Sequence, residues 1–253
     1  MRSRWAGASL PLVGAAAFIG VWWGVTVVFG IRSFFLPSPL DVVAAFRAQP
    51  EYLLTEAWST LQMTAIGFLI ALVAGLLIAM VLTMSRAVER ATMPLLVALN
   101  SIPKVALAPL LIVWIGYGAG PKIVMIVLIA FFPIVVSAAA GLSSTPADLG
   151  ELATSLSASW WQAYLKVRLP WALPQVFVGL KLGISLAVIG AVVAEISSPN
   201  GGLGAVVVLS GTSLDTPLAF AAITLLAILS IALFYLVVGL ERLLLPWARA
   251  ISA

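Results

Sequence analysis

The chain has 253 residues and a formal net charge of +4; 63% of its residues are hydrophobic and only 9% are charged. A soluble domain has roughly 45–50% apolar and about 25% charged residues, so a water-soluble fold cannot hide this much apolar surface. The absence of cysteine and histidine excludes disulfides, thiol chemistry, histidine-ligated metals and histidine-activated nucleophiles. The composition therefore predicts a membrane protein without a cofactor of its own.

Six apolar stretches are long enough to cross ~30 Å of hydrocarbon as helices, which requires about 20 residues. They cover approximately residues 10–30, 60–84, 93–117, 123–142, 173–196 and 218–240. The first follows Arg2 and Arg4, as a cleaved signal peptide would, but it is longer than a signal peptide's apolar region and is expected to be retained. The expected fold is one all-α domain, residues 1–253, a polytopic membrane helix bundle with about six transmembrane helices.

Lysine and arginine predict the orientation, because they concentrate in cytoplasmic loops. With the N-terminus inside, eight basic residues lie in cytoplasmic pieces: Arg2, Arg4, Arg86, Arg90, Lys166, Arg168, Arg242 and Arg249. The outer pieces hold three: Arg32, Arg47 and Lys122. Both termini are therefore expected to be cytoplasmic. The basic residues are too scattered to form a patch that would bind nucleic acid, so membrane lipid is the expected environment.

Two outer loops carry turn signals. In the first, Pro37 and Pro39 cannot continue a helix, and residues 41–46 are expected to form a short interfacial helix after them. In the last, Pro199 and the glycines of residues 201–204 predict a flexible turn that dips back into the membrane surface.

Residues 143–171 form the one long cytoplasmic connection, and they carry two helix-start signals. Thr145 is a capping residue before a proline, and Asp148 is an acid in the first turn that follows. Ser159 and Gln162 have the spacing of a capping box. Two short helices with a turn near Ser157 are expected, the second ending at Pro170. On the residues alone, an interfacial hairpin that only seals the bundle explains this pattern equally well.

The run from Glu151 through the proline at position 174, ELATSLSASWWQ followed by KVRLPWALP, resembles the EAA loop of ABC importer permeases. In that family the loop forms the coupling helix that docks in a groove of the ATP-binding subunit. Leu152 stands where the family usually has alanine, and Ser157 where it has glycine, whose freedom at positive φ serine lacks. The resemblance implies that the ATPase docks through Asp148, Glu151, Ala153, Ser157, Ala158, Ser159, Lys166 and Pro170.

The resemblance covers nearly the whole chain and is to the nitrate/sulfonate/taurine-type permeases. The matching segments are residues 36–39, 102–110, 114–116, 193–195 and 201–204. It implies a type I ABC importer fold in the bacterial cytoplasmic (inner) membrane. The implied partners are a second permease copy forming a homodimer, two copies of an ABC ATPase subunit and an extracytoplasmic substrate-binding protein. Because this branch also includes carriers of pyrimidine precursors and aromatic carboxylates, the resemblance leaves the substrate open.

Three polar residues, Asn100, Ser101 and Lys104, interrupt the third apolar stretch close to Pro103 and Pro109. Polar groups at membrane depth usually face the bundle interior or an aqueous cavity. The cluster therefore predicts a helix that lines the translocation route, with Lys104 attracting an anionic substrate. The alternative is a kinked packing helix whose lysine snorkels to the cytoplasmic side.

The fifth stretch contains two charges, Lys181 and Glu195, which are too far apart on one helix to pair. Lys181 is expected to snorkel toward the cytoplasm. Glu195 lies near the outer end, where it serves the outer gate or the contact with a binding protein, or is an ordinary helix-end acid. Small residues at positions 179, 183 and 190 allow close helix packing.

Several motifs are absent from the sequence. It has no G-x-x-x-x-G-K-[ST] loop, so ATP hydrolysis is expected in a separate partner, and no metalloprotease or serine-hydrolase motif, so no enzyme activity is expected. Apart from Glu195 and Glu241 at span ends, the acids are expected in loops, which disfavours a stand-alone secondary carrier or channel. The sequence thus predicts the permease subunit of an ATP-driven, binding-protein-dependent importer of a small, anionic solute.

Overall fold

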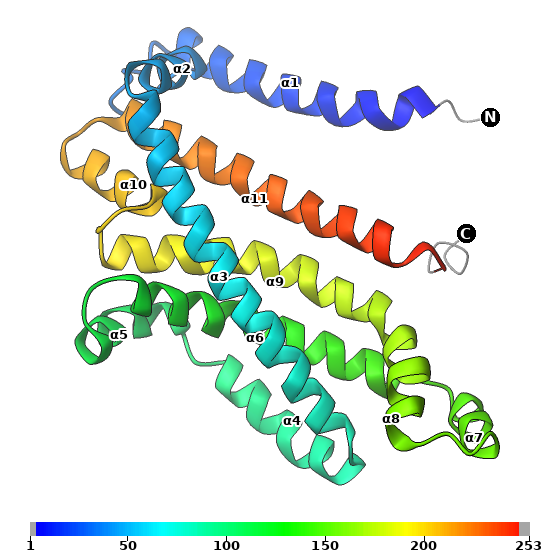
Figure 1. Ribbon diagram of the computed structural model, residues 1–253. Coiled ribbons are helices and arrows are strands. Elements are labelled where there is room, and N and C mark those ends of the chain that lie inside the picture. Colours follow the sequence, from blue (N-terminus) through cyan, green and yellow to red (C-terminus); the bar gives the residue numbers. More distant parts are fainter. Residues whose placement is uncertain (1–3, 248–253) are drawn as a thin grey trace.

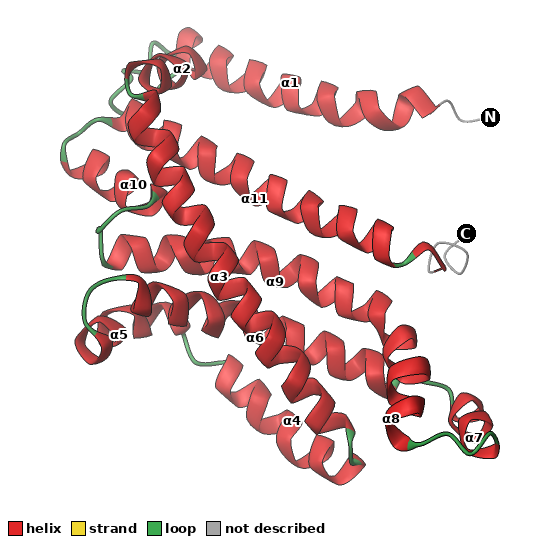
Figure 2. Cartoon of the chain, in the orientation of Figure 1, coloured by secondary structure: helices red, strands yellow, loops and turns green. Residues whose placement is uncertain are grey.

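The computed structural model describes residues 4–247, and the side chains of residues 13–247 except those of Arg86 and Thr154. Within the described residues the chain is helical, with connecting loops and no strand (Figure 2). The first half contains α1 Arg4–Val28, α2 Pro39–Ala48, α3 Pro50–Thr83, α4 Arg86–Asn100, the 3-10 turn η1 Lys104–Leu107, α5 Ala108–Ile115 and α6 Ala119–Ser143. The second half contains α7 Ala147–Ser155, α8 Trp160–Ala163, the π turn η2 Tyr164–Arg168, α9 Leu169–Ser197, α10 Leu203–Thr212 and α11 Thr216–Leu244.

Four helices of the described chain are long and apolar enough to cross a membrane: α3, α6, the continuous Trp160–Ser197 helix that contains α9, and α11. The pair formed by α4 and α5 is a fifth if it counts as one bent span. The first predicted span falls on α1, whose described side chains qualify only as a shorter apolar helix, Val13–Val28. The all-α bundle is confirmed, with four to five spans supported by length and composition where six were expected.

The helix ends fall into two groups (Figure 1). The start of α1, the end of α11 and the α7–α8 segment lie at one end of the bundle, and α2, α5 and α10 lie at the other. The structure thus places the loop of residues 143–171 at the same end as both termini of the described chain. Arg2 and Arg249, two of the charges used to predict the orientation, lie outside the described residues.

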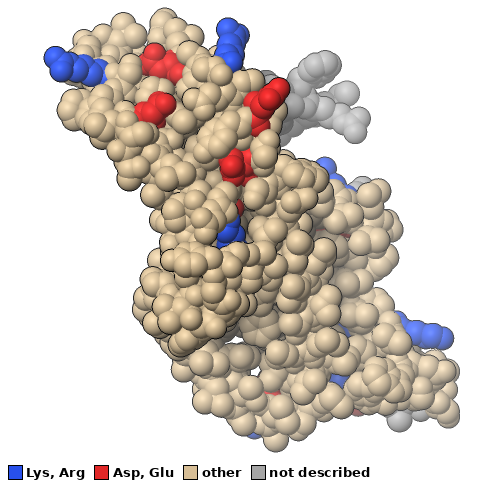
Figure 3. All heavy atoms as spheres, turned by 60° about the vertical axis from the view of Figure 1, so that its left-hand side comes forward, with Lys and Arg blue, Asp and Glu red and all other residues tan. Residues whose placement is uncertain are grey.

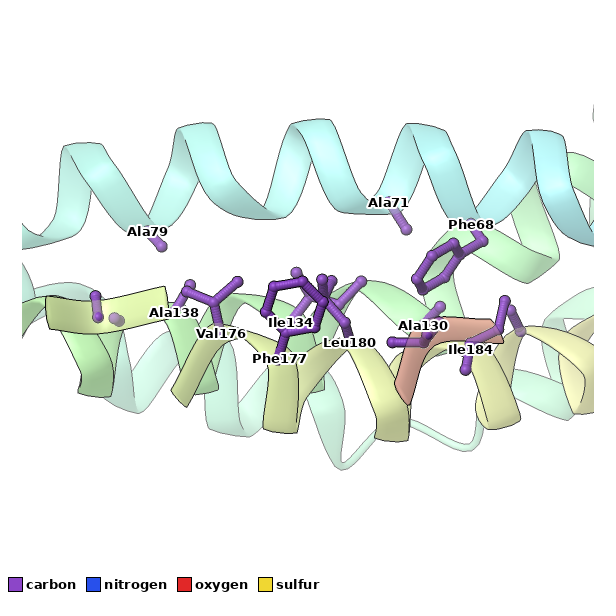
Figure 4. Close-up of a cluster of buried hydrophobic side chains, with 14 of the residues drawn as sticks. Phe68, Ala71, Ala79, Ala130, Ile134, Ala138, Val176, Phe177, Leu180 and Ile184 are labelled. Atoms are coloured by element: carbon purple, nitrogen blue, oxygen red, sulfur yellow. The ribbon is translucent and has the colours of Figure 1, made fainter. Parts of the chain in front are cut away.

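The core forms where α6 packs against α3 and α9 (Figure 4). Phe68 and Ala71 of α3 point toward α6 and α9, where Ala130 of α6 and Ile184 of α9 lie across from Phe68. Close approach is possible because glycines line the contacts: a side-chain carbon at Gly183 would lie 2.9 Å from Ile134 Cγ1, and one at Gly190 2.9 Å from the backbone of α6. The small residues of the fifth stretch therefore pack within the chain, as predicted.

The third predicted span is not one helix. It bends by 72° between Ala87–Asn100 and Lys104–Ile115. Pro103 cannot continue α4 because it has no N–H, and Pro109 occupies the first turn of α5, where a proline is tolerated. Gly116, with φ +85°, ends α5.

The expectation that Pro170 ends the helix from Trp160 is wrong. The chain remains helical from Trp160 to Ser197 because a π turn precedes the proline. In this turn the N–H of Leu169 reaches the carbonyl of Tyr164, five residues back, and the wider turn accommodates the ring of Pro170 at the start of α9. The second helix of the loop and the fifth span are thus one continuous helix.

The connection between α1 and α3 contains α2, which confirms the short helix expected there. Ser38 and Asp41 form a capping box at its start: the Ser38 N–H donates to Asp41 Oδ2 over 2.9 Å, and the Asp41 N–H donates to Ser38 Oγ over 3.3 Å. The backbone N–H of Ser38 and the hydroxyl of Ser33 together lower the pKa of Asp41 below its usual 3.8. Trp22 of α1 donates to the Pro37 carbonyl over 3.1 Å and so joins α1 to this loop.

Candidate coupling loop and transport elements

The α7–α8 hairpin, residues 147–163, projects from one end of the bundle (Figure 1). Its turn confirms the prediction near Ser157: the Ala158 N–H donates to the Ala153 carbonyl over 3.0 Å, which closes α7 in a Schellman motif. Ser157 has φ +53°, in the left-handed region. The serine thus adopts the backbone conformation for which the resembling family uses glycine.

The second arm of the hairpin starts at the predicted capping box. Ser159 Oγ accepts from the Gln162 N–H over 3.3 Å, and Gln162 Oε1 accepts from the Ser159 N–H over 2.9 Å. Trp160, the next residue, stacks on the buried Tyr164 one turn further along, with ring centroids 5.3 Å apart. The predicted cap at Thr145 is different: its hydroxyl donates to the Leu142 carbonyl over 3.1 Å and so supports the end of α6.

The predicted docking residues divide by exposure. Asp148, Glu151, Ser157, Ser159 and Lys166 are exposed, Ala158 and Pro170 are half-buried, and Ala153 is buried. Ala153 lines a hollow of about 190 Å³ between α7 and the π turn, so it shapes the hairpin from inside. The exposed members place two carboxylates on α7 and an ammonium on the π turn, which gives this end of the molecule a charged surface on a rigid support.

The predicted pathway residues Asn100, Ser101 and Lys104 meet at the break between α4 and α5. Lys104 Nζ donates to the Asn100 carbonyl over 3.3 Å and to Asn100 Oδ1. Ser101 Oγ donates to the Val97 carbonyl over 3.1 Å. Together these bonds satisfy the last carbonyls of α4 and place a cation at its C-terminal end, where the helix dipole favours one.

Glu195 is not at an exposed helix end: it is fully buried, with 0% of its surface accessible. Its Oε1 accepts from Thr60 Oγ1 over 2.9 Å, and its Oε2 accepts from the Gly204 N–H over 2.9 Å. Thr60 Oγ1 in turn accepts from the Leu203 N–H over 2.8 Å. Glu195 thus joins α9 to α3 and to the start of α10.

Two more charged side chains bind the backbone of residues 200–202, the turn just before α10. Glu56 of α3 accepts a hydrogen bond from the Gly202 N–H. Lys122 of α6, only 5% exposed, donates to the carbonyls of Asn200 and Gly201 over 3.1 and 2.7 Å. We call these contacts, with those of Thr60 and Glu195, the α10 clamp. Carboxylates suit this position because three N–H groups at a helix start carry partial positive charge.

A second polar contact inside the bundle joins Lys181 of α9 to Glu241 of α11, with an N–O distance of 2.9 Å. Lys181 therefore pairs with an acid instead of snorkelling freely. On the face that Figure 3 shows, few charged residues are visible, and acidic residues gather in the upper part, where Figure 1 places α2 and the start of α3.

The sequence reasoning missed Glu56, Thr60 and Lys122. It expected the second span to begin at Thr60 and therefore left Glu56 in a loop, whereas α3 begins at Pro50. An acid and a hydroxyl four residues apart lie on one helix face, and this spacing was the available signal. The structure brings Glu195 to these residues and leaves Lys104 with Asn100, so the predicted pathway residues occupy two separate places.

Comparison with known proteins identifies the family. Residues 67–250 match the family described as "Binding-protein-dependent transport system inner membrane component". The formylaminopyrimidine transport permease protein ThiX of Halalkalibacterium halodurans is 36% identical over 90% of this chain and 92% of its own length. A putative aliphatic sulfonates transport permease protein, SsuC of Bacillus subtilis, is 32% identical over 94% of this chain and 86% of its own length.

The fold is also found among solved structures. A chain of the MetNI methionine ABC transporter, in an inward-facing conformation, matches with a TM-score of 0.68 and 23% identity, over 77% of this chain and 97% of that chain. This likeness confirms the type I ABC importer fold that the sequence predicted. The chain therefore belongs to the binding-protein-dependent transport system inner-membrane components, the non-catalytic, multi-pass permease subunits of ABC importers, whose ATPase activity lies in a separate subunit.

Proposed function

We propose that two copies of this permease form the import pathway, that an ATPase subunit docks on each α7–α8 hairpin, and that an extracytoplasmic binding protein delivers the substrate. The observation that carries the docking is the hairpin itself. It is a capped, rigid projection whose exposed Asp148, Glu151 and Lys166 are free to meet a partner at one end of the bundle. A segment that only sealed the bundle would gain nothing from exposed charges on α7.

The orientation that docking requires has its own support. The hairpin lies at the same end as the start of α1 and the end of α11 (Figure 1), and most of the lysine and arginine residues are expected at that end. We therefore place this end in the cytoplasm and α2, α5 and α10 at the outer side. Reporter fusions test the orientation: fusions after Ser143 or after Arg249 should report cytoplasm, and fusions near Gln49 or Gly202 the outer side. An outer-side signal from residues 143–171 would overturn both orientation and docking.

The substrate that we propose is a small anion such as a sulfonate. Lys104 supports this choice because an ammonium has three donors, and Asn100 accepts from two of them, so one remains for a ligand at the broken span. A positive charge in a low-dielectric route raises the local concentration of anions. The relative named for formylaminopyrimidine transport keeps a pyrimidine precursor as the second candidate.

The proposal is tested by reconstitution with the ATPase and the binding protein encoded next to it. Expected results are co-elution of the ATPase, ATP-dependent uptake that needs the binding protein, and competition by sulfonates in preference to pyrimidines. Uptake without ATPase or binding protein would overturn the importer assembly. Preferential competition by pyrimidines would leave the assembly in place and replace the substrate.

A further inference from the structure

The α10 clamp ties one short helix to three long ones. The start of α10 is held from α3 by Glu56 and Thr60, from α9 by Glu195, and the loop before it is held from α6 by Lys122. The two glycines that precede α10 have φ values of +86° and +99°, which turn the chain sharply back into the bundle. At Gly202 any side-chain carbon would collide with the Glu195 carboxylate, so the turn can lie this close to the acid only with glycine at this position.

The clamp contacts support one another. The Thr60 hydroxyl both donates to Glu195 and accepts from the Leu203 N–H. Displacing either partner therefore weakens the hydrogen bond to the other one. If α10 moved away, the fully buried Glu195 would lose the hydrogen bond from the Gly204 N–H, and a buried carboxylate that loses a donor is destabilised. Partial loosening is therefore unfavourable, and α10 leaves its place only if the whole clamp opens.

In the broken span, α5 is packed against the bundle through the buried Ala108 and Leu111, but α4 and η1 are held more loosely than α10. Among the described side chains of α4 and η1 none is buried, and the hydrogen bonds of Lys104 and Ser101 are local to that segment. One exposed hydrogen bond, from Ser143 Oγ of α6 to Glu89 Oε1 over 3.1 Å, joins α4 to the bundle. Outward opening of an importer moves some elements past others. The structure therefore separates a firmly held element, α10, from a loosely held one, α4 with η1, which ends at the break before α5.

We propose that the α10 clamp makes α10 a fixed part of the outer wall, which moves together with α3 and α9 during transport, and that Glu195 and Thr60 are its positioning residues. The pathway then opens to the outer side at the α4–α5 break. This inference rests on the proposed import function, but the position of α10 can be measured independently of uptake.

Ser210 of α10 provides the reporter. It is 3% exposed and lies near the C-terminal end of α10. Because the chain has no cysteine of its own, Ser210→Cys introduces a single thiol into the permease. The assembled transporter in vesicles is treated with a small maleimide without nucleotide, with ATP, and with ATP plus vanadate. Labelling should stay slow and change less than about twofold between the states. An acceleration of about tenfold or more in one state would show that α10 is itself a moving gate and would overturn the proposal.

A matched pair of variants tests the clamp contact itself. Thr60 and Thr64 are both fully buried on α3, but the Thr64 hydroxyl has no hydrogen-bond partner among the described residues. In the Ser210→Cys background, Thr60→Val should raise the labelling rate on the order of tenfold, because it removes a bond to a charged group and a bond to α10. Thr64→Val should leave the rate unchanged. Equal rates for the two variants would overturn the role of Thr60.

Two further variants separate the possible outcomes. Glu195→Gln keeps one acceptor oxygen, so it should accelerate labelling less than Glu195→Ala does. Glu241→Gln breaks a polar contact elsewhere in the bundle and should leave the Ser210 site protected. Import should fall in the order of the labelling rates while the ATPase still co-elutes. If the Ser210→Cys parent shows no uptake but the labelling rates follow the expected order, the proposed import function is refuted and the role of the clamp contacts is upheld.

Discussion

Lys181 Nζ lies 2.9 Å from Glu241 Oε2 and 3.0 Å from Oε1, so one ammonium joins α9 to α11 through both oxygens of a carboxylate. The two side chains are each 24% exposed and lie 60 residues apart in the sequence. α11 is the least buried of the four helices long and apolar enough to span a membrane, with 17% of its apolar window buried. The pair therefore adds a polar contact to the apolar packing of α11, whose Ala221 and Ala222 are buried in a cluster with residues of α2 and α10.

Breaking this pair should destabilise the subunit. Lys181→Met or Glu241→Leu alone leaves one half-buried charge without its partner, which costs about 1–2 kcal/mol after allowance for the exposed part of the pair. Lys181→Met with Glu241→Leu removes both charges and should recover most of the loss. Thermal unfolding of the detergent-purified subunit measures the three values. Additive losses in the double variant would mean that the two residues do not interact.

Charge reversal on α7 should uncouple the permease from its ATPase. Glu151→Arg places a cation in the first turns of α7 and reverses the charge of the proposed docking surface, so ATPase affinity should fall on the order of tenfold with folding unchanged. Glu51→Arg is the matched control, because Glu51 is also an exposed acid near a helix start but lies at the opposite end of the bundle. Co-elution and ATPase stimulation distinguish the two. Normal stimulation by the Glu151 variant refutes docking at this position.

Lys104 has two possible roles, and three variants separate them. If Lys104 attracts the substrate, Lys104→Met should lower initial uptake of an anion several-fold, while Lys104→Arg should be milder because it keeps the charge. If it only caps α4, Lys104→Met and Asn100→Ala should each cost about 0.5–1 kcal/mol of stability and leave uptake unchanged. Uptake by vesicles with matched protein content, measured beside thermal stability, gives the answer.

The turn at Ser157 should accept glycine and reject branched residues. Its φ of +53° is strained for most side chains, so Ser157→Gly should be neutral or stabilise slightly, and Ser157→Val should cost about 1–2 kcal/mol. Limited proteolysis of the α7–α8 hairpin is the measurement, because local opening exposes this segment first. Ser155→Val is the control: it is an equally exposed serine two residues earlier, inside α7. Equal cleavage of both valine variants would contradict the predicted strain.

The capping box of α2 should stay intact well into the acid range. The pKa of Asp41 is lowered below 3.8 by the Ser38 N–H, so its contribution to stability is fully present above 3.8 and is lost as the pH falls through the lower, folded-state value. The difference in thermal midpoint between the wild-type subunit and Asp41→Asn should therefore be constant from about pH 7 to about pH 5 and shrink only below 3.8. A difference that already shrinks near pH 5 would contradict the lowered pKa.

Local signals in the sequence predicted local structure well. The capping box at Ser159 and Gln162, the turn at Ser157 and the short helix after Pro39 all depend on residues within a few positions of each other. Pro170 misled the prediction, because a proline normally ends a helix and nothing in the sequence announces the π turn that accommodates it.

Contacts between distant segments could not be predicted in the same way. Thr60 and Glu195 are 135 residues apart, and their pairing depends on how far α3 and α9 rotate about their own axes. An almost uniformly apolar helix carries little information about that rotation. The same reason explains why Lys181 was expected to snorkel when Glu241 is its partner.

The π turn has a mechanical consequence. Because it carries the helix past Pro170, residues Trp160–Ser197 form one helix of 38 residues, roughly 55 Å along its axis, with α8 at one end and Glu195 near the other. Although the helix changes direction near α8 (Figure 1), its backbone hydrogen bonds continue through the π turn, so a displacement of Trp160 is passed on through helix and not through a loop. The stroke of a motor bound at one face would thus reach the opposite face through a single piece of backbone.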